Sequence, residues 1–233
     1  MLVVCLPTYN ERENLEAMVS ALGDVLPGDG RILVIDDNSP DGTGVIADRL
    51  AAERDDVDVL HRPRKEGLGP AYLDGFRRAL TSGADLVVEM DCDFSHDPND
   101  VPRLVAAAED ADVVLGSRYV PGGGTRNWGL VRRLISRGGS LYAQILLGLR
   151  IRDLTGGFKV YRRVVLETIN LDAIDSRGYA FQIEGTYRAL RAGFRVVEVP
   201  IVFADREVGG SKMSRSIVLE AIWKVPALRL SRL

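Results

Sequence analysis

Two carboxylates directly follow an apolar run in the first half of the chain. Asp91 and Asp93 lie two residues apart after Met90, so in extended backbone both side chains point the same way. Hard divalent cations such as Mg²⁺ and Mn²⁺ prefer oxygen ligands, and one or two carboxylates with substrate phosphates complete such a site. The pair therefore predicts a metal site that holds a diphosphate. The alternative is a turn whose acidic residues only cap the next helix.

Two other strand ends carry groups suited to a nucleoside. The segment from Pro7 to Glu11 places the ring of Tyr9 and the carboxylate of Glu11 where they could face a base and a ribose. The segment from Asp36 to Gly42 is an acidic turn that can accept hydrogen bonds from a nucleobase or a sugar hydroxyl. Open parallel sheets bind ligands at the carboxyl ends of their strands, so we expect these strand ends to form one site.

Cations in the second half of the chain are candidates to neutralise bound phosphates. The fingerprints GxGxxG and GxxxxGK[ST] are absent after the first strand, so the usual glycine cradle for phosphate is missing. The candidate cations are Arg118, Arg132, Arg206 and Lys212, and a Gly-Gly pair at 209–210 is typical of a mobile lid. For each cation alone, a solvated surface position is the alternative.

The remaining reactive residues do not support other reaction classes. Cys5 and Cys92 lie in or beside apolar runs, and no histidine near a helix start is placed to activate them, so we interpret both as unbridged core residues. The histidines, His61 and His96, are too few for the usual zinc site, and His96 is expected to cap or orient the acidic loop. No G-x-S-x-G elbow of a serine hydrolase occurs.

The net charge of −3 hides an asymmetry between the two halves of the chain. Residues 1–116 hold 10 Lys/Arg and 24 Asp/Glu, a charge of −14, whereas residues 117–233 hold 20 and 9, a charge of +11. The basic half favours an anionic lipid or phosphate as partner. Nucleic acid is not expected, because few aromatics are interleaved with the arginines and no nucleic-acid-binding signature occurs.

Alternating apolar runs and amphipathic stretches must position these residues. A helix is predicted from Leu15 to Leu26, with a helix-start box of Asn10 and Glu13. This alternation predicts an α/β fold, a Rossmann-like, mostly parallel sheet with helices on both faces. The predicted strands are Leu2–Pro7, Arg31–Asp36, Val57–His61, Asp85–Met90 and Asp112–Gly116.

The second half has a less regular pattern. We expect helices near Leu130–Leu149 and Phe181–Ala192, a Gly156-Gly157 turn into a short strand, a strand at Arg195–Phe203, and a last amphipathic helix from about Ser216. One domain over residues 1–215 with an amphipathic segment at 216–233 is therefore expected. The longest mostly apolar stretch is too short to cross a bilayer, and the first residues lack signal-peptide features.

Five ordered motifs together resemble one family, the dolichol-phosphate or polyprenol-phosphate mannosyltransferases, which are inverting glycosyltransferases of the GT-A fold. The motifs are P-T-Y-N-E at Pro7, D-D-N-S-P-D-G-T at Asp36, M-D-C-D-F-S-H-D-P at Met90, G-S-R-Y at Gly116 and G-S-K at Gly210. The resemblance implies that residues 1–215 form a GT-A catalytic domain. It also implies transfer of mannose from GDP-mannose to the phosphate of a polyprenyl lipid, with inversion and with Mg²⁺ or Mn²⁺.

The resemblance also assigns roles to residues of this sequence. Catalytic roles are implied for Asp91, Asp93, Arg118 and Arg132. The nucleotide sugar would be held by Pro7, Tyr9, Glu11, Ile35, Asp37, Asp91, Cys92, Asp93, Arg118, Arg206 and Lys212. The metal would be held by Asp91 and Asp93, with Ser95 standing where some members carry a metal-contacting glutamine.

Because the implied acceptor is a polyprenyl phosphate lipid, we expect the protein to act at a membrane. Some relatives carry transmembrane helices after the catalytic domain, whereas here residues 216–233 suit an interfacial helix, a docking face for a membrane-anchoring partner, or packing on the protein's own core. We expect a cytoplasmic protein at the cytoplasmic face of a membrane. Two alternatives stay open: a lipid-phosphate transferase that uses UDP-glucose or a related donor, and a non-catalytic nucleotide-sugar-binding domain.

Overall fold

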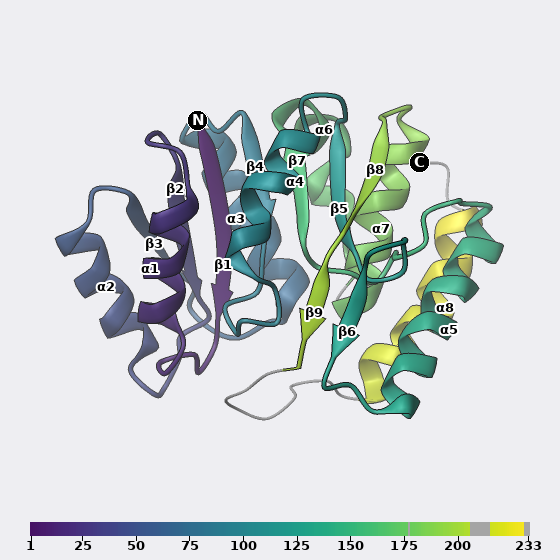
Figure 1. Ribbon diagram of the computed structural model, residues 1–233, viewed down its shortest axis with the longest axis horizontal. Helices are drawn as coiled ribbons and strands as arrows, with labels where there is room; N and C mark the ends of the chain where they lie inside the picture. Colours follow the sequence, from purple (N-terminus) through teal and green to yellow (C-terminus); the bar gives the residue numbers. More distant parts are fainter. Residues whose placement is uncertain (177, 206–214, 231–233) are drawn as a thin grey trace.

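The structure, a computed structural model, describes residues 1–176, 178–205 and 215–230. Its centre is a seven-stranded sheet in the order β3-β2-β1-β4-β7-β5-β8 (Figure 1). The strands are β1 Leu2–Thr8, β2 Arg31–Asp36, β3 Val57–His61, β4 Leu86–Glu89, β5 Val113–Ser117, β7 Lys159–Arg162 and β8 Val196–Pro200. All neighbours pair in parallel except β7, which runs antiparallel to β4 and β5. The sheet is therefore mostly parallel, as predicted.

Helices cover both faces of this sheet, because alternate strand residues point to opposite sides. Val3 and Cys5 of β1 belong to one buried cluster, whereas Leu2, Val4 and Leu6 belong to the other. The first cluster includes residues of α3 Leu68–Thr81, α5 Leu130–Leu147, α6 Arg163–Thr168, α7 Gly178–Arg191 and α8 Arg215–Leu230. The second includes residues of α1 Leu15–Val25, α2 Thr43–Glu53 and α4 Val101–Ala107.

Two short strands and two 3-10 turns complete the described fold. β6 Gly124–Arg126 and β9 Val202–Ala204 form a separate parallel pair, and 3-10 turns lie at Pro98–Asp100 and Leu171–Ala173. The predicted single strand Arg195–Phe203 is wrong in one respect, since it divides into β8 and β9. The division falls at Ile201, whose backbone N–H bonds to Ser117 of β5 before the chain leaves to pair with β6. This change of partner brings Ala204 next to the acidic loop, where its N–H bonds to the Ser95 carbonyl at 3.1 Å.

The predicted helix-start box at Asn10 and Glu13 is also wrong. The helix begins at Leu15, and the N-cap residue Asn14 makes no side-chain capping bond. Asn10 has φ 55°, a left-handed conformation that asparagine tolerates, so it lies in a turn rather than at a helix start. Its backbone N–H is bound instead by the Ser39 hydroxyl at 3.1 Å.

The last helix packs on the body of the protein. α8 lies against α7 and α5, and its residues Val225 and Leu228 are buried in the core cluster. Lys224 pairs with Asp175 at 2.6 Å, while Trp223 and Leu230 remain exposed. Within the described residues no helix combines the length and apolar composition needed to cross a membrane.

Candidate active site

The two aspartates that follow β4 are held in place by neighbouring groups. The Tyr72 hydroxyl donates a hydrogen bond to Oδ1 of Asp91 at 3.2 Å, and the backbone N–H of Ser95 donates to Oδ1 of Asp93 at 3.0 Å. Asp93 is buried, and the turn between these residues contains Phe94 at φ 58°. Such a left-handed residue is uncommon outside glycine and asparagine, which indicates that the surrounding contacts fix the turn.

His96 orients this acidic loop, as the sequence predicted. Its Nδ1 accepts a hydrogen bond from the backbone N–H of Asp91 at 3.2 Å. The ring stacks on Phe158, with centroids 4.9 Å apart, and meets the edge of Phe203 at 5.2 Å. Burial lowers the pKa of His96 to about 4, so the ring is neutral near pH 7 and can accept this bond.

The donor set at this loop fits a hard divalent cation. Two carboxylates, Asp91 and Asp93, follow the same strand end, and substrate phosphates and water usually complete the shell of Mg²⁺. Among the described residues no group of three or more His, Cys, Asp or Glu side chains is placed to hold a metal ion. Two carboxylates leave positions in the shell of Mg²⁺ that phosphate oxygens and water can fill.

Arg118 follows β5 and is paired with an aspartate that the sequence did not single out. Its Nε and Nη2 donate to the two carboxylate oxygens of Asp153 at 2.7 and 2.6 Å, and Nη2 also donates to Thr155 at 3.0 Å. Both members of the pair are buried. The guanidinium also lies 5.4 Å from the ring centroids of Trp128 and Phe203. This packing fixes Arg118 in one orientation.

Phe203 of β9 connects the acidic loop with the arginines. Its ring lies 5.2 Å from the ring of His96, between centroids, and the Arg118 guanidinium lies 5.4 Å from the centroid of the same ring. Burial raises the pKa of the nearby Tyr179 hydroxyl at the start of α7, and Arg118 and Arg132 oppose that rise. The acidic loop after β4 therefore lies close to the cation that follows β5. Arg132 also pairs with Asp205 and lies 4.2 Å from the Trp128 ring centroid.

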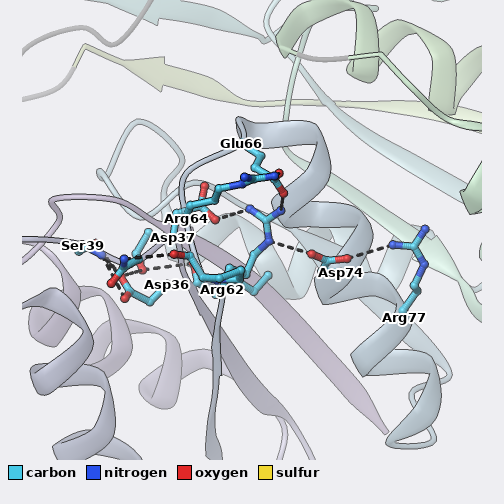
Figure 2. Close-up of polar contacts among 12 residues, drawn as sticks. Asp36, Asp37, Ser39, Arg62, Arg64, Glu66, Asp74 and Arg77 are labelled. Carbon is cyan, nitrogen blue, oxygen red and sulfur yellow. Dashed lines mark hydrogen bonds and ion pairs between the residues drawn. The ribbon is translucent and has the colours of Figure 1, made fainter.

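A second group of polar residues lies at the ends of β1 and β2. Asp37 is buried and paired with Arg62, which comes from the loop after β3. Figure 2 shows Arg62 between Asp37, Glu66 and Asp74, and its bonds to the latter two are 3.0 and 2.8 Å long. Burial raises the pKa of the Asp37 carboxyl, and Arg62 opposes that rise. Asp37, which the sequence predicts to bind the nucleoside, is therefore held in place by the buried cation of Arg62.

The predicted contacts from β1 lie beside this network. The ammonium of Lys65 lies 3.9 Å from the centroid of the Tyr9 ring, which leaves an aromatic and a cation together at the strand end. Glu11 is buried, and its carboxylate accepts a bond from Asn14 at 2.8 Å. Its backbone N–H bonds to the Thr43 hydroxyl at 3.0 Å, which ties the segment after β1 to α2.

Three predicted residues are buried beside the site. The Ile35 side chain is fully buried against α3. Only its backbone lies toward the polar strand end, where its carbonyl accepts a hydrogen bond from the Thr8 hydroxyl at 3.3 Å. Cys92 and Ser95 are buried. Pro7, partly exposed, ends the apolar part of β1. Arg206 and Lys212 lie outside the described residues, and so does the expected Gly-Gly lid.

A buried charge pair that the sequence did not predict lies beneath the acidic loop. Glu89 of β4 and Lys159 of β7 are register partners and are completely buried. The Lys159 ammonium donates to the backbone carbonyl of Gln182 at 2.7 Å, and the Gln182 amide donates to Glu89. Burial raises the pKa of Glu89 and lowers that of Lys159. The signal that could have found Glu89 is a single charge at the end of the otherwise apolar β4, whereas β7 begins with Lys159 and ends with Arg162 and gives no such signal.

Comparison with known proteins defines the class to which this fold and site belong. The chain belongs to glycosyl transferase family 2, whose model matches residues 3–169. Within that family its relatives are polyprenol-phosphate mannosyltransferases. The undecaprenyl-phosphate mannosyltransferase of Micrococcus luteus is 53% identical over 94% of this chain and 90% of its own length. The polyprenol monophosphomannose synthase of Mycolicibacterium smegmatis is 52% identical over 96% of this chain and 84% of its own length.

Solved structures confirm the GT-A type of fold. Glucosyl-3-phosphoglycerate synthase from Mycobacterium tuberculosis, in complex with phosphoglyceric acid, matches with a TM-score of 0.71 at 20% identity. The match covers 98% of this chain and 79% of that one. The same synthase in complex with Mn²⁺, uridine diphosphate and glucosyl-3-phosphoglycerate also gives a TM-score of 0.71 at 20% identity, over 98% and 79% of the two chains. At this level of identity the likeness concerns the fold.

Proposed function

We propose that the protein transfers mannose from GDP-mannose to the phosphate of a polyprenyl lipid, with inversion at the anomeric carbon and with Mg²⁺ or Mn²⁺. Relatives that share more than half of their residues with this chain are named for mannose and for a polyprenyl phosphate. The observation that most directly supports the proposal is the packing of His96, from the acidic loop, and of Arg118 against the same Phe203 ring. A diphosphate and an acceptor phosphate need cations on both sides, and this arrangement supplies them.

The nucleoside end of the donor is proposed to lie at β1 and β2. Guanine offers adjacent N–H donors on its base edge, and a fixed carboxylate accepts such donors well. Asp37 is fixed by Arg62, Glu11 is fixed by Asn14, and the Tyr9 ring offers an aromatic surface to a base. Pro7, Ile35 and Cys92 would contribute backbone or shape rather than charge.

The metal is proposed to be held by Asp91 and Asp93, with Ser95 as a third contact. When bound, it offsets the negative charge that builds on the departing diphosphate. The chain's own contribution is to hold the two carboxylates in one geometry. Tyr72, His96 and the Ser95 backbone do this through the hydrogen bonds described above. Solved neighbours that hold Mn²⁺ or Mg²⁺ with uridine diphosphate support such a role.

The acceptor needs positioning more than activation. A phosphomonoester has a second pKa of about 6, so it is mostly dianionic at pH 7 and already nucleophilic. One of its oxygens forms the new bond to the anomeric carbon of mannose as the bond to the diphosphate breaks, and the electron pair leaves with GDP. Arg118 and Arg132 are proposed to orient the phosphates, together with Arg206 and Lys212. Because attack comes opposite the leaving group, the configuration inverts.

In the decisive experiment, purified protein is incubated with GDP-mannose, Mg²⁺ and a polyprenyl phosphate, with and without a chelator. We expect polyprenyl phosphate mannose to form, and its formation to stop when the chelator is present. Asp93→Asn should abolish it, and Asp97→Asn is the matched control, since it removes the same charge from an exposed residue and retains a side chain able to cap the next turn. Transfer from UDP-glucose but not GDP-mannose would establish the glucosyltransferase alternative, and donor binding without turnover would establish the binding domain.

A further inference from the structure

Trp128 is a buried residue within an exposed stretch that connects β6 to α5. The residues on either side, 126–127 and 129–130, are exposed, whereas Trp128 is only 7% exposed. The backbone turns sharply just before it, because Asn127 has φ 62°, a left-handed conformation. A tryptophan turned inward from an exposed loop indicates that its ring makes contacts with other parts of the fold.

Two arginines from different elements lie against the Trp128 ring. The guanidinium carbon of Arg132, in the first turn of α5, is 4.2 Å from the ring centroid, and that of Arg118, after β5, is 5.4 Å from it. Cations within about 6 Å of an aromatic centroid are attracted to the ring, and tryptophan attracts them most strongly. The edge of Phe203 also meets this ring, at a centroid distance of 5.2 Å. One ring therefore fixes the positions of two cations that repel each other.

The partners of these arginines leave part of each guanidinium unused. Asp153 and Thr155 accept hydrogen bonds from Nε and Nη2 of Arg118. Asp205 accepts one from Nη1 of Arg132. Within the described residues, Nη1 of Arg118 and both Nε and Nη2 of Arg132 make no such bond. Guanidinium N–H groups bind phosphate oxygens well when their orientation is fixed, so the remaining donors suit a phosphate held between the two arginines.

The indole N–H of Trp128 favours a role for the ring face rather than for the hydrogen-bonding group. Nε1 is buried and has no hydrogen-bond partner in the part of the chain that the structure describes. Buried donors are nearly always paired, because an unpaired donor loses its hydration without compensation. A phenylalanine ring would avoid that loss but would attract the two cations less strongly. The presence of tryptophan is therefore explained by its electron-rich ring.

We propose that Trp128 is a positioning residue for the acceptor phosphate, because its ring holds Arg118 and Arg132 with their remaining N–H groups toward that phosphate. The inference rests on the proposed function for the identity of the ligand as an isoprenyl phosphomonoester. The acceptor is favoured over the donor diphosphate because Asp91 and Asp93, with a metal, are proposed to serve the latter. Figure 1 shows β6 and α5 at the end of the molecule away from β2, where the nucleoside of the donor is proposed to lie.

The test replaces Trp128 by fluorinated tryptophans, which keep its shape and its N–H but withdraw electrons from the ring. Site-specific incorporation of mono-, di- and trifluorotryptophan gives a graded series. Isothermal titration calorimetry then measures the binding of geranyl phosphate, a short isoprenyl phosphate, without donor or vesicles. The Kd should rise at each step, by about ten-fold in the trifluoro form, because the attraction between ring and cations weakens.

The same series at Trp223 is the matched control. That ring is 78% exposed on α8, so its fluorination should leave the Kd for geranyl phosphate unchanged. Kinetics with the substituted side chain add a second measurement. Trp128→Leu should raise the KM for geranyl phosphate about ten-fold and leave the KM for GDP-mannose unchanged, and Trp128→Phe should fall between Leu and the wild type. A purely structural loss would reduce the amount of active enzyme, and with it kcat, without moving one KM relative to the other.

Several outcomes would overturn this proposal. One is an unchanged Kd across the series at position 128. Another is a Kd that falls with fluorination, since fluorine makes the indole N–H a stronger donor and the ligand would then be bound by that group. Equal changes in the binding of GDP-mannose and geranyl phosphate, or no binding of geranyl phosphate by the wild type, would also overturn it.

Failure of the proposed function gives a different result. In that case the wild type would bind geranyl phosphate, and the Kd would respond to fluorination of Trp128, but no mannose would be transferred from GDP-mannose to a polyprenyl phosphate.

Discussion

The Tyr72 hydroxyl lies 3.2 Å from Oδ1 of Asp91 and donates a hydrogen bond to it, which joins the core helix α3 to the acidic loop after β4. The Tyr72 ring is completely buried and stacks on Phe76 and Phe181 at centroid distances of 5.8 and 6.0 Å. Because the ring cannot move without disturbing this stack, the hydroxyl holds the carboxylate in one orientation. The core of the protein thus fixes a proposed metal ligand.

Tyr72→Phe should raise the Mg²⁺ or Mn²⁺ concentration needed for half-maximal transfer by about ten-fold. The substitution keeps the stacked ring and removes only the hydroxyl, and a hydrogen bond to a charged group contributes about 1.5–3 kcal/mol. A metal titration of the transfer reaction measures the change. Tyr142→Phe is the control, because that hydroxyl bonds to the Ile222 carbonyl on the side of α8. An unaltered metal requirement in Tyr72→Phe would show that the bond does not position Asp91.

Asp153→Asn should lower both the stability and the activity, although Asp153 itself is not proposed to touch the substrate. The change leaves the buried Arg118 without its carboxylate partner, and breaking a buried ion pair in this way costs about 3–5 kcal/mol. Urea unfolding gives the loss of stability, and turnover at saturating donor gives the loss of activity. Arg163 pairs with Glu167 on the surface, so Glu167→Gln serves as the control and should change stability by less than about 1 kcal/mol. Full activity of folded Asp153→Asn would contradict the positioning role.

His61 should make a small, pH-dependent contribution to stability. Its hydrogen bond to Asp48 is the main cause that raises its pKa above the ordinary value. Since the folded protein binds this proton more tightly than the unfolded chain, the stabilisation is complete below the ordinary pKa of about 6.5 and is lost as the pH rises through the folded pKa. His61→Asn should therefore be less stable than the wild type at pH 5.5 and equally stable at pH 9. The difference at pH 5.5 should be only about a few tenths of a kcal/mol, because the ring is half exposed. Thermal unfolding at the two pH values measures this, and a difference that grows toward pH 9 would contradict the assignment.

The sequence predicted the parts of this protein that depend on local pattern. The strands are continuous apolar runs because both faces of the sheet are covered, and their predicted bounds agree with the structure to within one or two residues at β1 to β5. The placement of Asp91 and Asp93 after β4 followed from the same pattern. The pairing of Arg118 with Asp153 did not, because these residues are 35 positions apart and meet only through the tertiary fold.

Helix starts and strand ends were less predictable for a related reason. Asn10 and Glu13 have the spacing of a capping box, but the Ser39 hydroxyl binds the Asn10 backbone and holds it in a turn. Similarly, the residues from Arg195 to Phe203 have one continuous strand pattern, but two different partner strands divide them at Ile201. In both cases a contact distant in the sequence overrides the local signal.

Glu89 and Lys159 form a buried pair whose mutual stabilisation can be measured. Lys159→Met should destabilise the protein by about 3–5 kcal/mol, because it removes the cation that opposes the burial-driven rise in the Glu89 pKa. The double variant Glu89→Gln with Lys159→Met should recover most of this loss. The neutral amide no longer needs a cation, and the Gln182 carbonyl still accepts a bond from Thr186 at 3.1 Å. Urea unfolding of the wild type, both single variants and the double variant gives the coupling energy between the two residues. Additive losses in the double variant would mean that the two charges do not stabilise one another, and that neutral donors such as Gln182 satisfy Glu89 beneath the acidic loop.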